Sequence, residues 1–214
     1  MSAIGETNFL EDPAVRAFVT QSHRRRFSAK QTVIHSGDPP QCLYLILEGS
    51  VSILAEDEQG REMVLAYCHP GEFFGEMCLF PHLESRSALV RTRAETWVAE
   101  MGFEPFKAFS AKHPEVMKVL AGQLALRLRD TSRRLADLNF LDVSGRVARI
   151  LLDLANQPDA QREERGCIVK LSRQELARIA GCSREMAGRV LKTLEDDGLI
   201  ESSGRKILIL QPGS

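Results

Sequence analysis

The sequence predicts an α+β chain in three parts. They are an antiparallel β jelly roll over residues 1–112, a long dimerisation helix with a hinge over 113–141, and a winged helix-turn-helix over 142–214. Three observations support this division. Short β-branched and aromatic runs separated by glycine turns fill residues 27–101, which is typical of an antiparallel sandwich or jelly roll. The apolar period then becomes that of a long helix, and in the last part helices alternate with short strands.

Composition excludes several classes of protein. With 214 residues, of which 43% are hydrophobic and 27% charged, the chain has the make-up of an ordinary globular protein. No apolar stretch approaches the length of a membrane span, and the N-terminal residues do not form a signal peptide. We therefore expect a cytoplasmic protein without a membrane partner. The net charge of −1 means that any nucleic-acid binding must come from a local arrangement of charges.

Neither a metal site nor catalysis is expected. The five cysteines are scattered without a C-x-x-C pair, and the five histidines lack the spacing of metal ligands. Jelly rolls also house metal-dependent enzymes, but these need several histidines and a carboxylate around one metal. We therefore predict no metal and no catalytic residues.

The jelly-roll strands are predicted from four runs. These are "CLYLILEG" at 42–49, "SVSILAED" at 50–57, "EMVLAYC" at 62–68 and "ETWVAEM" at 95–101. The segments "SGD", "EGS", "EQGRE" and "HPGE" supply glycine turns. No helix of useful length is expected within this region.

A long helix is predicted after Pro114, which suits the first turn of a helix. Its apolar positions alternate in spacings of four and three, the heptad pattern of a helix that pairs with another helix. These positions are Met117, Ala121, Leu124, Leu128, Thr131, Leu135 and Leu138. Thr131 is polar within this seam, and Ser132 follows it. Two readings stay open, that Thr131 sets the register of the pair and that it contacts a ligand. The seam predicts a homodimer through 113–141.

A helix-turn-helix is predicted over 171–200. Ser172 and Glu175 form a capping box that starts one helix, and Gly181 ends it. Ser183 then caps a second helix only two residues later. Two short strands around Ser203 and Gly204 form the wing.

The second helix has one apolar and one charged face. The apolar face consists of Ala187, Val190, Leu191 and Leu194, and the charged face includes Arg184, Glu185, Gly188, Arg189 and Lys192. Arginine can donate to guanine and glutamate can accept from cytosine in the major groove. The alternative is an exposed ion pair between Glu185 and Arg189. Arg173 and the wing residue Arg205 are placed to meet phosphates.

A small anion site is predicted near the end of the jelly roll. Gly75 and Glu76 follow a strand, and Arg86 and Ser87 follow ten residues later. Backbone N–H groups, a guanidinium, a hydroxyl and a carboxylate suit a sugar phosphate, whose phosphate pairs with arginine and whose ribose hydroxyl donates to glutamate. The alternative is that Arg86 only pairs with Glu84 at the surface.

These motifs together resemble the CRP/FNR family of bacterial transcription regulators over about residues 20–210. The pattern Gly75-Glu76 followed by Arg86-Ser87-Ala88 resembles the phosphate-binding cassette of cyclic-nucleotide-binding domains. The segments "NFLDVSGR" and "SRQELARIAGCSREMAGRVLK" resemble the family's hinge and helix-turn-helix. The resemblance implies a homodimer, activated allosterically by cyclic AMP, that reads palindromic TGTGA-like DNA and contacts RNA polymerase.

The resemblance also implies roles for individual residues. Cyclic AMP would contact Gly75, Glu76, Arg86, Ser87, Arg127, Thr131 and, from the partner chain, Ser132. Double-stranded DNA would contact Arg173, Gln174, Ser183, Arg184, Glu185, Arg189 and Lys192. Asp142 would be the hinge that reorients the DNA-binding domain.

Three departures from the family pattern leave alternatives open. Cys78 stands where the cassette usually has glycine or alanine, and Pro105 replaces a lysine of one surface that touches RNA polymerase. His23, Arg25 and Arg26 retain basic character near that surface. The run Arg24-Arg25-Arg26 is more typical of a solvated face than of a contact surface. The loop "AQREERGC" differs from a second such surface. Control by cyclic di-GMP, or no ligand control, is therefore the alternative function.

Overall fold

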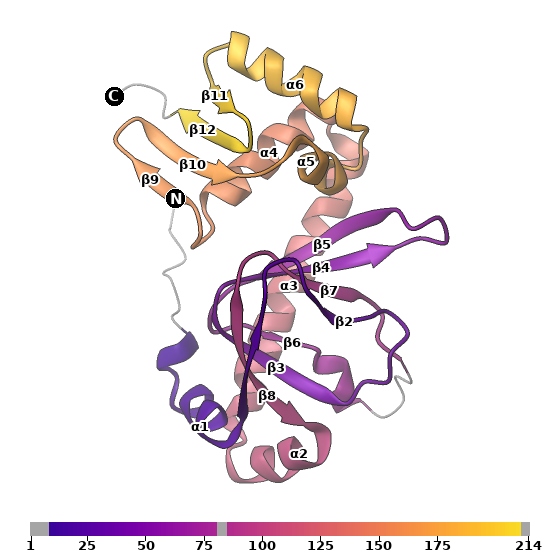
Figure 1. Cartoon of the computed structure of the whole chain (residues 1–214), viewed down its shortest axis with the longest axis vertical. Helices are drawn as coiled ribbons and strands as arrows, with labels where there is room; N and C mark the ends of the chain where they lie inside the picture. Colours follow the sequence, from indigo (N-terminus) through magenta and orange to yellow (C-terminus); the bar gives the residue numbers. More distant parts are fainter. Residues whose placement is uncertain (1–8, 81–84, 211–214) are drawn as a thin grey trace. The chain divides into compact units, whose positions relative to one another are not determined.

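The computed structural model describes residues 9–80 and 85–210. The chain divides into two compact units, one ending at Asp130 and the other starting at Thr131, and each is described by itself. The predicted α+β class is confirmed, with antiparallel sheets, a long helix and a C-terminal helix-turn-helix (Figure 1). The three-part division at residues 112 and 141 stays a prediction.

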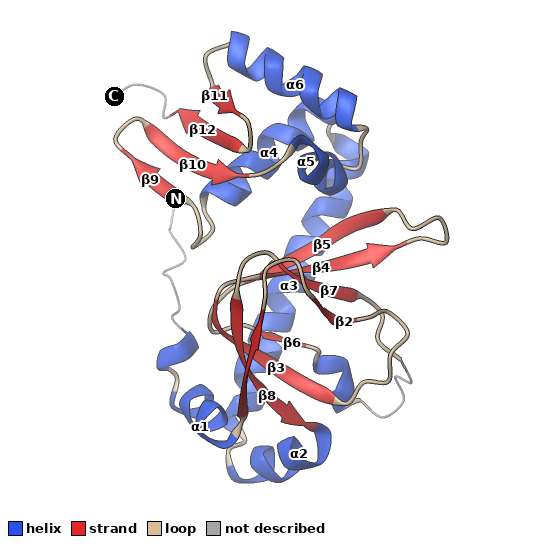
Figure 2. Cartoon of the chain, viewed as in Figure 1, coloured by secondary structure: helices blue, strands red, loops and turns tan. Residues whose placement is uncertain are grey.

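The first unit is a jelly roll of two four-stranded antiparallel sheets among its described residues. One sheet has the order β1-β8-β3-β6, and the other has the order β2-β7-β4-β5 (Figure 2). The strands are β1 (His23–Phe27), β2 (Thr32–Ile34), β3 (Cys42–Glu48), β4 (Val51–Glu56), β5 (Glu62–Cys68), β6 (Phe73–Phe74), β7 (Leu89–Thr92) and β8 (Thr96–Gly102). The four runs that predicted strands become β3, β4, β5 and β8.

Strand β3 explains why the core has two layers. Its side chains alternate, so Leu43 and Leu45 lie on one face while Tyr44 and Ile46 lie on the other, and all four are buried. The face of Tyr44 and Ile46 packs against the second sheet, and the face of Leu43 and Leu45 packs under helices. A strand covered on both sides needs a continuous apolar run, which is what "LYLI" supplies.

The helices of the first unit cover the outer face of the β3 sheet. They are η1 (Phe9–Glu11), α1 (Pro13–Gln21), η2 (Glu76–Leu79), α2 (Phe103–Lys112) and the part of α3 (Glu115–Phe140) up to Asp130. Phe18 of α1 contacts the rings of Phe73, Phe106 and Phe109 edge-on. No described helix is long and apolar enough to cross a membrane.

Strand β1 was not predicted, because its basic run has no apolar alternation. It forms through backbone pairing with β8, in which Arg24 lies opposite Ala99 and Arg26 opposite Trp97. The arginines are exposed, as the solvated reading expected. Arg25 pairs with Glu100 at 3.3 Å, and Arg26 pairs with Glu95. Ion pairing therefore neutralises part of the positive charge.

The second unit is a winged helix-turn-helix. Its elements are α4 (Val143–Ala155), β9 (Gln161–Glu163), β10 (Gly166–Lys170), α5 (Arg173–Ala180), α6 (Arg184–Asp196), β11 (Ile200–Ser203) and β12 (Lys206–Leu210). The strands form one sheet with the order β11-β12-β10-β9. Strand β9 lies where the sequence predicted only a polar loop.

The predicted helix caps are present as expected. The Ser172 hydroxyl accepts from the N–H of Glu175 at 3.2 Å, and the Glu175 carboxylate accepts from the N–H of Ser172 at 2.9 Å. Gly181 ends α5 in the left-handed region, with φ of 61°. Ser183 accepts from the N–H of Met186 at 3.1 Å. The turn geometry is thus encoded locally.

Replacing Ser172 by alanine should lower the free energy of unfolding of the protein by about 1 kcal/mol, because α5 loses an N-cap acceptor. Urea denaturation followed by circular dichroism measures this loss. Ser144→Ala is the control, because Ser144 lies exposed in the first turn of α4. Equal unfolding free energies in the two variants would show that the cap does not stabilise α5.

Candidate functional site

The predicted anion site is built at the end of β6. Gly75 follows this strand with φ of 79°, a left-handed conformation that favours glycine, and η2 begins at the next residue. A Cβ atom on Gly75 would lie 2.9 Å from Nη1 of Arg86 and 3.1 Å from the carbonyl oxygen of Cys42. Glycine is therefore required both by the turn and by the close approach of Arg86. We call residues 75–79 together with Arg86 and Ser87 the cassette.

Arg86 is a buried cation within the cassette. Its side chain is only 6% exposed, and it donates from Nη1 to the Gly75 carbonyl at 2.7 Å and from Nη2 to the Cys42 carbonyl at 2.8 Å. No ion pair joins it to a carboxylate of the described residues. The guanidinium has more N–H groups than these two bonds use, so donors remain for an anion. Glu84, the alternative partner, lies outside the described residues.

Two residues behind Arg86 were not anticipated from the sequence. Tyr44 stacks on Phe74 with ring centroids 4.9 Å apart, and Cys42 supplies the carbonyl that fixes Arg86. Burial raises the pKa of Tyr44 and raises that of Cys42 to about 11. Both groups are thus neutral at physiological pH, and neither can compensate the charge of Arg86. Both residues lie far from Arg86 in the sequence, so no local pattern predicted that they would contact it.

Ser87 occupies the exposed side of the cassette. Its hydroxyl donates to the sulfur of Met77 at 3.0 Å, a weak acceptor that a phosphate oxygen could replace. The backbone of Cys78 lies in η2, while its side chain is not part of the described structure. The effect of Cys78 on the cassette therefore stays a prediction.

Glu76 and Arg127 bring the cassette and helix α3 together. Nη1 of Arg127 lies 3.5 Å from Oε2 of Glu76, and Nη2 of Arg127 donates to the carbonyl of Phe73. Both charged side chains are largely buried. The structure thus joins four of the predicted ligand residues, Gly75, Glu76, Arg86 and Arg127, through direct or shared contacts.

The heptad seam of α3 is exposed in the single chain. Leu128 is 69% exposed, Leu135 62% and Leu138 49%. Thr131 and Ser132 are exposed as well. Thr131 follows Arg127 by four residues, so the two share one side of the helix. The leucines of this helix thus form an apolar stripe that the described residues of the chain leave exposed.

The charged face of α6 is exposed as predicted. Arg184, Glu185, Arg189 and Lys192 are exposed, while Ala187, Val190 and Leu191 are buried against the rest of the unit. Arg173 and Gln174 are exposed at the start of α5. A hollow lined by Ser172, Arg173, Gln174, Arg184, Ser202 and Gly204 separates the two helix starts from the wing. One face therefore gathers basic side chains although the unit as a whole is nearly neutral.

The wing is tied to the capping box. Nη2 of Arg205 donates to Oε2 of Glu175 at 3.1 Å, the same oxygen that caps Ser172. The N–H of Leu171 donates to the carbonyl of Arg205 at 2.7 Å. The sequence gave Arg205 only a role at phosphate, so this link to α5 is new.

The predicted hinge residue is a helix cap. Oδ1 of Asp142 accepts from the N–H of Gly145 at 2.7 Å and starts α4. Arg146, which the sequence did not single out, donates to the Leu141 carbonyl at 3.0 Å and to the Ala180 carbonyl at 2.9 Å. Arg146 thus connects the chain before α4 to the end of α5. A hinge role for Asp142 stays a prediction.

The cysteines do not form a redox or metal centre among the described residues. Burial raises the pKa of Cys68 to about 12 and raises that of Cys182 as well. No group of three or more His, Cys, Asp or Glu side chains within the described ranges could hold a metal. Cys68 is a small buried side chain of the core, whereas Cys182 is only partly buried.

A jelly roll joined to a winged helix-turn-helix defines the class of DNA-binding transcription regulators. Family models agree with this class, since residues 24–113 match a cyclic nucleotide-binding domain and residues 145–214 match a Crp-like helix-turn-helix domain. The chain belongs to the CRP/FNR family of bacterial transcription regulators. Its relatives are regulators, so the protein is not an enzyme.

Three relatives illustrate the similarity. The chain is 50% identical over 190 residues to the cAMP-activated global transcriptional regulator Vfr of Pseudomonas aeruginosa, covering 87% of this chain and 89% of Vfr. It is 42% identical over 198 residues to the cAMP-activated global transcriptional regulator CRP of Salmonella typhimurium, covering 92% and 94%. The solved structure of the c-di-GMP responsive global regulator CLP of Xanthomonas campestris matches with a TM-score of 0.85 and 42% identity, covering 93% and 99%.

Proposed function

We propose that this regulator binds cyclic AMP in the cassette and, when it does, binds palindromic TGTGA-like DNA more tightly. The observation that carries the proposal is Arg86. A guanidinium that is 6% exposed has no carboxylate partner among the described residues and keeps N–H donors beside the left-handed turn at Gly75. Burying an uncompensated charge is costly, and a phosphate would offset that cost. The two cAMP-activated relatives support cyclic AMP as the source of the phosphate.

The other ligand contacts follow from the family pattern. Glu76 would accept from the ribose hydroxyl, and Ser87 would donate to the cyclic phosphate. Thr131, with Ser132 of a second copy, would meet the adenine. The exposed leucines of α3 support the second copy, because an apolar heptad stripe is stabilised when the same helix of another chain covers it.

DNA recognition would use both copies of α6. Two recognition helices related by a two-fold axis would enter successive major grooves about 34 Å apart, which requires a palindromic site. Residues 142–214 carry twelve basic and eleven acidic side chains, so affinity would come from the exposed face of α6 and the start of α5. Cyclic AMP would act by binding the DNA-competent arrangement more tightly than the other.

Fluorescence anisotropy with labelled TGTGA palindromic DNA tests the proposal. Cyclic AMP should raise the DNA affinity of the full-length protein, and that affinity should fall steeply as salt is added. A duplex with scrambled half-sites is the control for non-specific binding. Equal affinity with and without cyclic AMP would reject control by this ligand.

Control by cyclic di-GMP is the second candidate function. The observation in its favour is the high structural similarity to CLP, a c-di-GMP responsive regulator. Ser87 favours cyclic AMP, because a regulator that had abandoned this ligand would be free to lose the hydroxyl. Isothermal titration calorimetry with each nucleotide separates the candidates. Heat from cyclic di-GMP alone would favour the second, and heat from neither would indicate regulation without these ligands.

Replacing Thr131 by leucine should separate the two readings of the polar seam residue. An apolar side chain in the seam should tighten the unliganded dimer, and loss of the hydroxyl should blunt the response to cyclic AMP. Analytical ultracentrifugation measures the first effect and anisotropy the second. If the response to cyclic AMP stays intact, Thr131 only sets register. Ala125→Leu, at another exposed position of α3, is the control.

Contact with RNA polymerase and a cytoplasmic location stay predictions. The basic run of β1 is the surface that we expect to lie near RNA polymerase. Because Arg25 and Arg26 are paired with Glu100 and Glu95, an acidic partner would have to compete with these carboxylates. Pro105 adds no charge to this surface. We therefore expect the surface to bind an acidic partner less strongly than a fully basic surface would.

A further inference from the structure

Strand β6 ends its sheet with an unpaired edge that helix α3 covers. Among the strands of residues 9–80 and 85–210, the order β1-β8-β3-β6 leaves one side of β6 without a neighbour. Toward β3, the N–H of Gly71 donates to Ile46 and the carbonyl of Glu72 accepts from Ile46, at 2.8 Å and 3.1 Å. The N–H of Glu72 donates to the His69 carbonyl at 3.0 Å, which leaves the carbonyl of Gly71 and the N–H and carbonyl of Phe73 to bond on the side of α3. Left unpaired and buried, they would cost free energy.

Gln123 of α3 takes two of these groups. Its Oε1 accepts from the N–H of Phe73 at 2.8 Å, and its Nε2 donates to the carbonyl of Gly71 at 2.9 Å. Its side chain is only 3% exposed. A side-chain amide carries the same donor and acceptor as a peptide, so Gln123 substitutes for one residue of a missing strand. Both hydrogen bonds of Gln123 form only when β6 lies at one position along the axis of α3, so together they fix that position.

Arg127 extends this contact to the cassette. One helical turn after Gln123, it donates to the carbonyl of Phe73 and pairs with Glu76. Gly75 and Glu76 directly follow β6, so any shift of the strand along α3 would shift the cassette by the same amount. The Arg127–Glu76 pair is long at 3.5 Å, whereas Gln123 makes two shorter hydrogen bonds, of 2.8 Å to Phe73 and 2.9 Å to Gly71.

We infer that Gln123 is a positioning residue that holds strand β6 at one position along the axis of α3. Because the cassette directly follows β6, Gln123 thereby couples ligand occupancy of the cassette to the position of α3. The inference rests on the proposed function for the nature of the ligand. The bonds of Gln123 do not depend on that function. Gln123 itself would touch neither nucleotide nor DNA.

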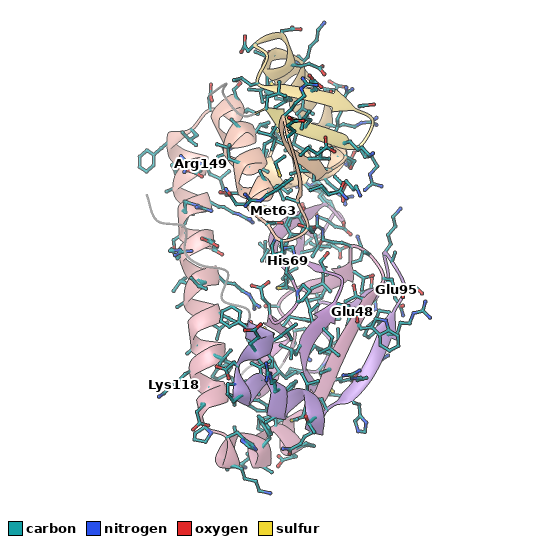
Figure 3. The ribbon with its side chains drawn as sticks, turned by 90° about the vertical axis from the view of Figure 1, so that its left-hand side faces the viewer. Glu48, Met63, His69, Glu95, Lys118 and Arg149 are labelled. Carbon is teal, nitrogen blue, oxygen red and sulfur yellow. The ribbon has the colours of Figure 1, made fainter. Side chains whose placement is uncertain are left out.

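Two variants and one control test this role in the full-length protein. Gln123→Met keeps length and apolar volume but removes both hydrogen bonds, and Gln123→Glu keeps the acceptor while placing a carboxylate against the Gly71 carbonyl. Lys118→Met is the matched control, since Lys118 is exposed on the side of α3 turned away from the sheets (Figure 3). Hydrogen exchange of peptides that cover residues 69–77, without nucleotide, measures how firmly β6 is held.

The expected results distinguish positioning from a general loss of structure. Exchange in residues 69–77 should be slowest in wild type and Lys118→Met, faster in Gln123→Glu and fastest in Gln123→Met. The ratio of DNA affinities with and without cyclic AMP should fall by roughly fivefold or more in Gln123→Met. Calorimetry should still show cyclic AMP binding in that variant, at an affinity within about threefold of wild type.

Three outcomes would overturn the inference. They are unchanged exchange in Gln123→Met, an unchanged affinity ratio, and loss of cyclic AMP binding in step with thermal stability, which would indicate a purely structural role. If wild-type DNA binding ignores cyclic AMP, the proposed function fails. The exchange comparison then still decides whether Gln123 holds the strand.

Discussion

Replacing Arg86 by methionine is expected to weaken cyclic AMP binding by at least about 100-fold, because hydrogen bonds to a charged partner contribute about 1.5–3 kcal/mol each and a phosphate would make at least two. Methionine fills a similar volume but offers no donor. Calorimetry measures the affinity directly. A second measurement is the thermal shift, since ligand at about 100 times its dissociation constant should stabilise the wild type by about 2.7 kcal/mol and the variant by almost nothing.

Two comparisons separate loss of binding from loss of folding. Arg86→Met also leaves the carbonyls of Gly75 and Cys42 without their donor, so it should unfold more easily than wild type. Arg91→Met is the control, because Arg91 lies on β7 and pairs with Glu62 through two bonds of 3.0 Å and 2.7 Å. That variant should lose stability and keep cyclic AMP affinity. A folded Arg86→Met protein with wild-type affinity would exclude Arg86 from the phosphate site.

The second large effect is expected at Arg184 on α6. A side chain that reads a base contributes about 1–3 kcal/mol for each base pair. A homodimer reads a palindrome twice, so Arg184→Ala should cost roughly 30-fold or more in affinity for the specific site. The variant should also lose discrimination at one base pair in each half-site, measured by anisotropy with a panel of single-base variants.

The salt dependence and a control variant complete this test. An arginine that reads a base should leave the slope of affinity against salt nearly unchanged, whereas Arg173→Ala should flatten it if Arg173 meets a phosphate. Arg149→Ala removes the same charge from α4, away from α5 and α6 (Figure 3). That variant should keep both affinity and discrimination. A uniform loss over all DNA sequences in Arg184→Ala would assign Arg184 to the backbone.

The helix-turn-helix was predictable because its signals are local. Ser172 and Glu175 lie three residues apart, and both bonds of the capping box are formed in the structure. Gly181 and Ser183 likewise act within one turn of their own position. Such motifs fix backbone geometry whatever the rest of the chain does.

Elements held by distant partners were not predictable in the same way. Strand β1 reads as a charged surface segment, and only its pairing with β8, seventy residues later in sequence, makes it a strand. Gln123 reads as an ordinary polar residue of a helix, and its role is visible only through Gly71 and Phe73, 52 and 50 residues away. The carbonyl of Cys42 that fixes Arg86 lies 44 residues from it. Periodicity carries no information about such contacts.

The carboxylate of Glu175 serves two parts of the DNA-binding unit at once. One of its oxygens accepts from the backbone of Ser172 at the start of α5 and from Arg205 in the wing. A substitution of Glu175 that changes its contact with the wing therefore also changes the cap at the start of α5. Glu175→Gln would retain an acceptor for the helix but weaken the hold on the wing, whereas alanine would remove both. Sequence variation that tunes how the wing meets DNA is accordingly expected at position 205 and not at 175.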